Sequence, residues 1–140
     1  MNKNEIIDFL NANPAFHLAT VEGSKPHVRG MYLYQADENG TLFHTGKMKD
    51  LHQQLTKNSN VEMSFNNGKL ADLIQVRVSG TAELIEDMDL KKEIVQKRPF
   101  LKPWVERDGY GSLAVYRIRK GMAVVWTMDA NFAQKEPVEL

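Results

Sequence analysis

The order of short strand-like segments and turn signals constrains the fold of this chain more than any other feature. The segments FHLATV (16–21) and PHVRGMYLYQ (26–35) are rich in β-branched and aromatic residues and flank the turn-forming sequence EGSK, so they predict a hairpin. Asn39-Gly40 is a strong hairpin signal and leads into a third segment, TLFHT (41–45). We therefore expect the first three strands to form one consecutive antiparallel meander.

The rest of the chain continues this pattern. Residues 60–65 alternate between apolar and polar side chains as a strand does. Residues 73–85 predict a longer strand, in which Gly80 marks a bulge or a bend. The segments 112–118 and 122–128 are expected to close the chain as a hairpin, because a short polar turn separates them.

Apolar residues at helical spacing predict short helices within residues 6–10, 48–55 and 90–95, whereas residues 98–111 are expected to form a surface loop. About six antiparallel strands with helices in the crossovers predict a mainly β fold. We expect a small six-stranded barrel, because closing a sheet removes its exposed edges. A chain of 140 residues is expected to form a single domain, residues 1–140.

The composition narrows the classes of function. Eighteen basic residues balance eighteen acidic ones, which disfavours nucleic acid and membrane surfaces as partners. The chain has no cysteine and its four histidines lack metal-site spacing, so we expect no metal site. No apolar run reaches the length of a membrane span, and the first residues do not read as a signal peptide, so a cytoplasmic location is expected.

An anion site is predicted where the third strand leads into a helix. Thr45 and Gly46 end the strand, and Lys47 and Lys49 precede the helical pattern. A hydroxyl, a close backbone approach and ammonium groups at a helix start suit a phosphate. Arg29, on the preceding strand, is able to grip the same phosphate with two nitrogens. Taken alone, the two lysines also fit an ordinary solvated surface.

The ordered set of segments resembles a known family. FHLATVEGSKPHVRGM, LFHTGKMKDLHQQLTKNSNVEMSF, IQVRVSGTAELIED, RPFLKPW and AVYRIRKGMAVVW follow one another as in the pyridoxamine 5'-phosphate oxidase-like family, closest to the short general-stress-protein type. The resemblance covers roughly residues 5–127. It implies an FMN-binding split barrel that forms a homodimer, with FMN at the subunit interface.

The resemblance also implies roles for individual residues. Arg29 would hold the FMN phosphate together with Lys49, or with Lys47 as the near alternative. Gln75 and Trp126 would contact the flavin, with Gln75 reaching it from the partner subunit. The cofactor-binding residues implied by the resemblance are Arg29, Gly30, Met31, His44, Thr45, Lys47, Lys49, Gln75 and Trp126.

The substrate site of the vitamin oxidase is only partly matched. Arg98 is similar to one of its basic residues, but Tyr34 and Ile94 stand where the oxidase has a lysine and a tyrosine. The resemblance therefore implies an FMN-dependent oxidoreductase that acts on an unknown small molecule, with no catalytic residue assigned. The alternatives are a non-enzymatic flavin or haem carrier linked to stress, and a relative that uses a deazaflavin.

Overall fold

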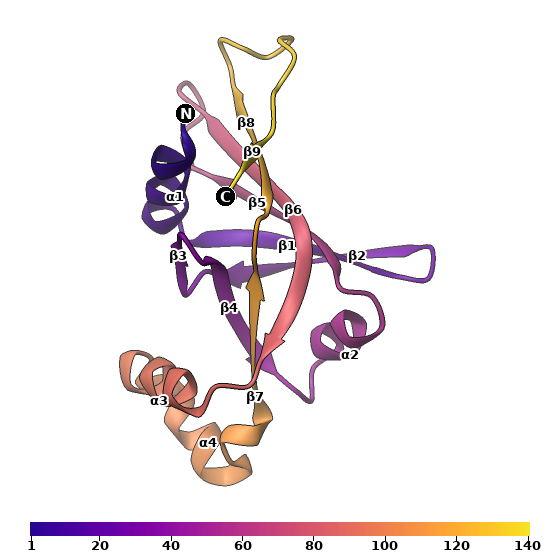
Figure 1. The fold of residues 1–140 in the computed structure, drawn as a ribbon, viewed down its shortest axis with the longest axis vertical. Helices are drawn as coiled ribbons and strands as arrows, with labels where there is room; N and C mark the ends of the chain where they lie inside the picture. The colour runs from indigo at the N-terminus through magenta and orange to yellow at the C-terminus, as the bar shows by residue number, and fades with distance from the viewer.

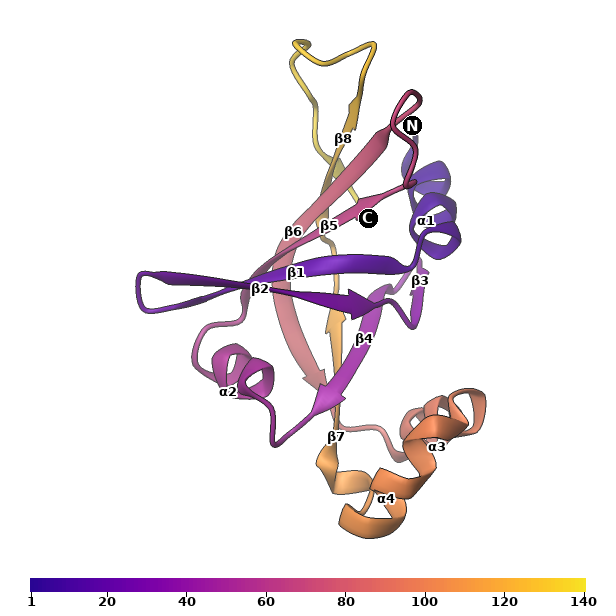
Figure 2. The ribbon, with the colours of Figure 1, turned by 180° about the vertical axis from the view of Figure 1, so that it is seen from behind.

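A computed structural model describes all 140 residues as a mainly β fold with short helices (Figures 1 and 2). The helices are α1 (Lys3–Ala12), α2 (Asp50–Lys57), α3 (Met88–Lys97) and α4 (Lys102–Asp108), with 3-10 turns η1 (Pro99–Leu101) and η2 (Tyr110–Ser112). The strands are β1 (Ala15–Glu22), β2 (Lys25–Tyr32), β3 (Gln35–Asp37), β4 (Gly40–Gly46), β5 (Asn60–Asn66), β6 (Ile74–Ile85), β7 (Leu113–Ile118), β8 (Met122–Thr127) and β9 (Val138–Glu139).

All strand pairs are antiparallel, and the path of paired strands runs β2-β1-β5-β6-β7-β4-β3, with β8 and β9 branching from β6. The predicted mainly β class is confirmed. The number of strands differs from the prediction, because there are nine strands and the sheet does not close into a ring. The long strand β6 explains the shape, since its first half pairs with β8 and its last residues pair with β7.

The predicted meander of three strands is wrong at its second step. β1 and β2 pair as expected, but β2 ends at Tyr32 and has no neighbour other than β1. The chain then turns through Leu33, whose N–H donates to the carbonyl of Pro14. The short strand β3 pairs with β4 around the Asn39-Gly40 turn instead. The turn signal was therefore right, but it joins a three-residue strand to β4.

The predicted hairpin of β7 and β8 is also wrong, because these strands do not pair with each other. Their pairings with β6 instead follow one another along that strand, with Ile118 opposite Ala82 and Met122 opposite Ser79, and Gly80 and Gly121 lie at the junction. A Cβ at Gly80 would come within 2.6 Å of Ile118 Cγ2, and one at Gly121 within 2.6 Å of Val78 Cγ1. The backbones approach closely here because both residues lack a side chain.

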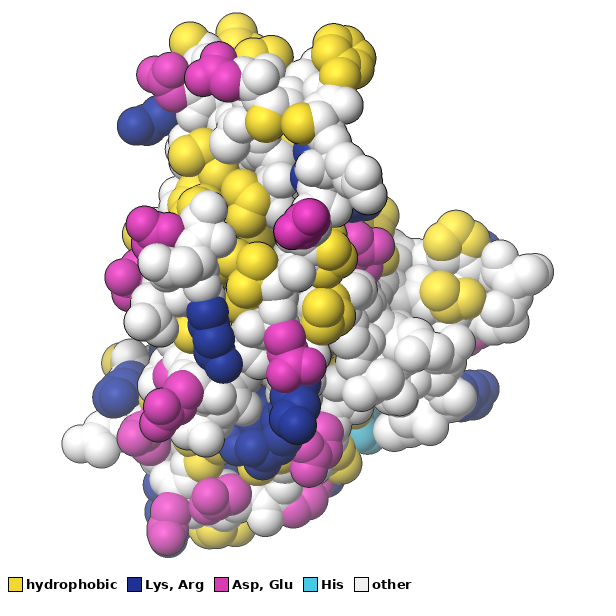
Figure 3. Space-filling view, turned by 45° about the horizontal axis from the view of Figure 1, so that its top comes forward, with side chains coloured by type: hydrophobic (Ala, Val, Ile, Leu, Met, Phe, Trp, Pro, Cys, Tyr) yellow, Lys and Arg dark blue, Asp and Glu magenta, His cyan; other side chains and the backbone are white.

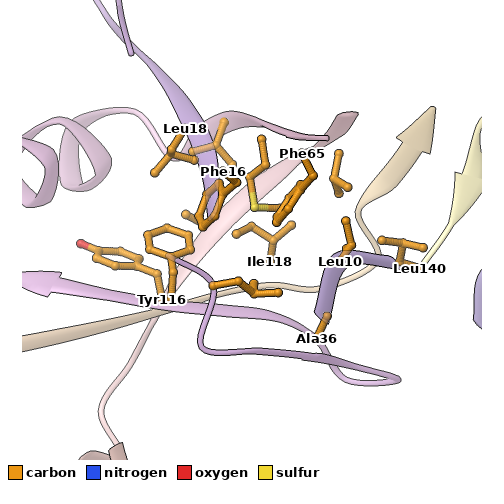
Figure 4. Packing of buried hydrophobic residues seen from close by; sticks show 14 of the residues in the cluster. Leu10, Phe16, Leu18, Ala36, Phe65, Tyr116, Ile118 and Leu140 are labelled. Carbon is orange, nitrogen blue, oxygen red and sulfur yellow. The ribbon is translucent and has the colours of Figure 1, made fainter. Parts of the chain in front are cut away.

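Aromatic rings fill the centre of the core. Phe16 stacks on Phe65 with 4.8 Å between ring centroids, and Phe43 stacks on Tyr116 at 5.8 Å. Figure 4 shows Phe16, Phe65 and Tyr116 packed among aliphatic side chains from several strands and with Leu10 of α1. The inward positions of β1 and β5 alternate with exposed ones, which is the pattern expected of half-buried strands.

The helices lie at the periphery. A capping box, in which the Asn2 side chain accepts from the Glu5 N–H and Glu5 accepts from the Asn2 N–H, begins α1. Residues 98–111, predicted as a loop, instead contain η1, α4 and η2. Proline in the first turns of η1 and α4 and Gly109 after α4, at φ +80°, explain these helical turns. None of the helices is long and apolar enough to span a membrane.

Candidate functional site

A groove forms where β2, the end of β4 and the start of α2 meet. β2 is an edge strand with many exposed side chains, so residues on its open face are free to line a surface hollow. The structure brings five of the predicted cofactor-binding residues together in this groove, namely Arg29, Gly30, Met31, Thr45 and Lys49. A Cβ built at Gly30 would meet no atom within 4 Å, so the space above this part of β2 is open.

The guanidinium of Arg29 is held by neutral partners only. Its Nη1 donates to the carbonyl of Leu18 at 3.2 Å and to Thr20 Oγ1 at 2.8 Å. Its Nη2 donates to Oε1 of Gln54, which also accepts from the Thr20 hydroxyl at 2.6 Å. Burial lowers the pKa of Arg29, and Asp50 partly opposes this effect. The guanidinium remains charged, because the ordinary pKa of arginine lies far above neutrality.

Lys49 supplies the second positive charge. It precedes the first turn of α2, and no side-chain cap bonds to that turn. Its Nζ lies 5.7 Å from the ring centroid of Trp104 and forms no ion pair. Lys47, the alternative predicted residue, does not line the groove. Its ammonium is paired with Glu86 at 2.8 Å, and the same carboxylate binds the buried Lys91 at 3.0 Å.

These residues suit an anion with several oxygens. Arg29 and Lys49 contribute two positive charges to the groove, and Asp50 is the only carboxylate in its lining. Neither cation has an acidic partner within 4.0 Å, so an anion would not have to break an existing ion pair. The hydroxyl of Thr45 and the backbone N–H groups at the start of α2 add neutral donors. The donor set therefore fits a phosphate group.

His44 lies beside the groove and is bound by Arg98. Arg98 Nη1 lies 2.7 Å from His44 Nε2, and Nη2 donates to the carbonyl of Leu33 at 2.8 Å. Arginine can only donate, so Nε2 must be the acceptor and the imidazole proton must be on Nδ1. Burial, with the charges of Arg98 and Lys49, lowers the pKa of His44 to about 4. The imidazole is therefore neutral at physiological pH.

The lowered pKa of His44 makes the stability of the folded protein depend on pH. Between pH values of about 6.5 and about 4, the unfolded chain protonates His44 while the folded chain does not, so acidification favours unfolding. We expect His44 alone to lower the free energy of unfolding by about 3 kcal/mol across this window. Urea denaturation at pH 7.5 and pH 4.5 measures the change.

His44→Gln is the matched variant for this measurement, because the glutamine carbonyl is still able to accept from Arg98 but does not titrate. The pKa of His52 is also lowered by burial, so part of the pH dependence should remain in the variant. An unchanged loss of stability in His44→Gln would show that His44 does not cause it.

Arg98, the predicted substrate residue, is engaged within the protein. In addition to its hydrogen bonds to His44 and Leu33, its guanidinium lies over the rings of Tyr32 and Tyr34, at 5.6 and 5.1 Å from their centroids. Arg98 therefore joins the end of α3 to the sheet. Each of its terminal nitrogens therefore already has one acceptor within the protein.

Gln75 and Trp126 lie apart from the groove. They are opposite each other on β6 and β8, and they line a separate hollow together with Arg77, Val124 and Lys135. Trp126 Nε1 donates to Asn131 Oδ1 at 2.9 Å. Within one chain, the structure therefore divides the predicted cofactor-binding residues between two surfaces.

Three residues that contact Arg29 or Lys49 were not predicted. Thr20 and Gln54 are buried polar residues that hold Arg29, and Trp104 on α4 faces Lys49. Gln54 belongs to a helical stretch whose apolar positions were recognised, and its place between Leu51 and Leu55 on the buried face was the available signal. Trp104 was assigned to a loop, although Pro103 before it is typical of a first helical turn.

Comparison with known proteins places these residues in a family context. Residues 3–127 match the family described as Pyridoxamine 5'-phosphate oxidase. The sequence matches no curated protein.

Solved structures share the fold. A NimC/NimA family protein from Clostridium acetobutylicum is 24% identical with a TM-score of 0.77, and the alignment covers 98% of this chain and 91% of that one. General Stress Protein 26 from Bacillus anthracis is 22% identical with a TM-score of 0.73, covering 99% and 98%. An FAD-binding protein from Mesorhizobium loti is 18% identical with a TM-score of 0.62, covering 84% and 88%.

Proposed function

Because the chain belongs to the pyridoxamine 5'-phosphate oxidase family, we propose that it is a flavoprotein whose groove holds the phosphate of FMN. The observation that carries this proposal is the pair of cations, Arg29 and Lys49, that share one groove and lack acidic partners. The FAD-binding protein from Mesorhizobium loti has a similar fold, which supports a flavin as the ligand.

Four residues of the groove have a defined task in this proposal. Arg29 and Lys49 neutralise the phosphate dianion, and the Thr45 hydroxyl donates to one of its oxygens. The open space above Gly30 leaves room for a ligand close to the backbone of β2. Bound FMN would supply the electron transfer, while the protein fixes its position and its electrostatic surroundings.

We further propose a homodimer with FMN between its subunits. This assembly would let Gln75 and Trp126 of one copy approach the groove of another, which they do not reach within a single chain. The upper half of the face in Figure 3 gathers apolar side chains, and large exposed apolar patches often mark interfaces. Exposed apolar residues near the β5–β6 turn and in the C-terminal region include Leu70, Met122, Met128 and Phe132.

The reaction proposed is an FMN-dependent oxidation or reduction of a small molecule. Tyr34 and Ile94, which stand where the vitamin oxidase has a lysine and a tyrosine, argue against a phosphorylated vitamin as the substrate. Anaerobic addition of NADPH or NADH to the FMN-loaded protein separates an enzyme from a carrier. Bleaching of the flavin absorbance supports a reductase, and no bleaching with either donor favours a protein that binds flavin without turning it over.

Arg29→Ala tests the phosphate site directly. We expect FMN binding to weaken by about 2–3 kcal/mol, or roughly 30- to 150-fold, because a charged contact to the phosphate is lost. Titration of FMN fluorescence measures the affinity, and light scattering on the same samples gives the oligomeric state. Arg119→Ala removes an exposed arginine that is paired with Glu83 and serves as the control. Equal affinities in all three proteins would place the phosphate elsewhere.

A further inference from the structure

Another hollow lies next to the groove, between the end of β4, the 3-10 turn η1 and the helix α4. Its volume is about 150 Å³. An apolar cavity of about this size is able to hold a benzene ring. Phe100, Leu101, Trp104 and Val105 form the wall on the helical side, and Leu113 lies on the strand side. The hollow therefore offers an apolar space of a size that suits one aromatic ring.

Phe100 and Trp104 are the reason to look for a ligand here. Phe100 is 68% exposed and Trp104 is 49% exposed, although both are large aromatic side chains. Aromatic residues usually bury most of their surface, and exposed ones that border a hollow are available to stack on a guest. Phe100 and Trp104 thus leave apolar surface exposed to solvent, and an aromatic ring in the hollow would cover part of it.

His44 lines the same hollow and carries a polar hydrogen that has no partner in the protein. Arg98 donates to Nε2, which leaves the proton on Nδ1, and no group of the protein accepts from Nδ1. Arg98 is itself held by the carbonyl of Leu33, so the imidazole is fixed in orientation. A ligand oxygen within reach would complete the hydrogen bonding of His44 without moving any side chain.

The charges around the hollow favour an anion. Lys49 lies in its wall, Arg98 lies directly behind His44, and the lining contains no aspartate or glutamate. A cationic ligand would meet two positive charges and an imidazole that has no free acceptor. An anionic oxygen would meet a hydrogen-bond donor and a positive potential.

We propose that this hollow binds a single-ring aromatic carboxylate, with its ring against Trp104 and one carboxylate oxygen accepting from His44 Nδ1. Thr45 and Lys49 line both the hollow and the groove, so the bound ring would lie next to the groove. This inference rests on the proposed function in one respect, which is that the ligand would be the small molecule that reacts with the flavin. Binding itself does not depend on that reaction.

Isothermal titration with benzoate tests the hollow, using the protein with and without saturating FMN. We expect a dissociation constant of about 1 mM, as is reasonable for a ligand of about nine non-hydrogen atoms. Benzylammonium has the same ring with the opposite charge, and acetate has the carboxylate without the ring. Each should bind at least tenfold more weakly than benzoate.

Variants assign the binding to these residues. Val105→Phe fills the hollow and should abolish benzoate binding, whereas Glu106→Phe places the same ring on an exposed position of α4 and should leave it unchanged. His44→Gln keeps an acceptor for Arg98 but has no donor at the position of Nδ1, so benzoate should bind at least tenfold more weakly. Thermal melts show whether each variant is folded. If Val105→Phe does not fold, the result with His44→Gln decides whether benzoate binds in the hollow.

The outcomes separate this inference from the proposed function. Absence of benzoate binding, or equal binding in His44→Gln and in the original protein, overturns the inference even if FMN binds. Mutual exclusion of benzoate and FMN also overturns it, because the hollow would then belong to the cofactor site. Benzoate binding without any FMN binding would keep the hollow as a ligand site and reject the flavin proposal.

Discussion

Replacing Gln54 with glutamate is expected to weaken FMN binding about 100-fold while the fold stays intact. The substitution keeps the shape of the side chain and the oxygen that accepts from Arg29 and Thr20. It also places a negative charge against the guanidinium, which at present has only neutral partners. The groove would then lose one of its two uncompensated positive charges, and a phosphate would gain a carboxylate neighbour.

Gln53→Glu is the matched control. It adds the same charge one residue away on α2, at an exposed position outside the lining of the groove. FMN titration should show nearly unchanged affinity for Gln53→Glu and a large loss for Gln54→Glu. Urea denaturation should show that Gln54→Glu is at least as stable as the original protein, since a partly buried cation gains a partner. Equal affinities in the two variants would mean that the charge state of Arg29 does not control binding.

Gly40→Ala is expected to destabilise the protein by about 3 kcal/mol or more. Gly40 has φ +120°, a region that residues with a side chain rarely adopt. A Cβ there would lie 2.2 Å from the carbonyl oxygen of Ile118. This oxygen belongs to the backbone of β7, so relieving the overlap requires β4 and β7 to move apart. The free energy of unfolding in urea measures the effect.

Gly23→Ala separates the two causes. Gly23 also has a positive φ, +60°, but a Cβ there meets nothing within 4 Å. This variant should lose only about 1 kcal/mol, the cost of the backbone conformation alone. A loss in Gly40→Ala no larger than that in Gly23→Ala would show that the β4–β7 contact yields easily.

Local sequence patterns predicted the helices and strands better than they predicted which strands pair with each other. The β1–β2 hairpin and the Asn39-Gly40 turn depend on neighbouring residues, so the sequence predicted both. The failed pairings of β2 with β4 and of β7 with β8 depend on which surfaces bury the most apolar area, which is a property of the whole chain. The missed helix α4 has a different cause, because its seven residues carry only a weak helical pattern.

The candidate site shows the same contrast between residues that the sequence indicates and contacts that it does not. Resemblance to a family indicated Arg29 and Lys49, and the structure places both in one groove. The resemblance favoured Lys49 and left Lys47 as the alternative, and what occupies Lys47 is its pairing with Glu86, about forty residues away in the sequence. Likewise, the role of Gln54 depends on a contact with Arg29 across two elements. Residue type alone does not reveal such contacts.

The pairing of β6 with β8 at one end and with β7 at the other has a mechanical consequence. Its first residues hold β8, its last residues hold β7, and β5 runs along most of its other side. Neither half of the molecule is therefore able to detach while β6 keeps its shape. A displacement at the groove, passed from β2 through β1 and β5, would reach the surface of Gln75 and Trp126 through a single continuous strand.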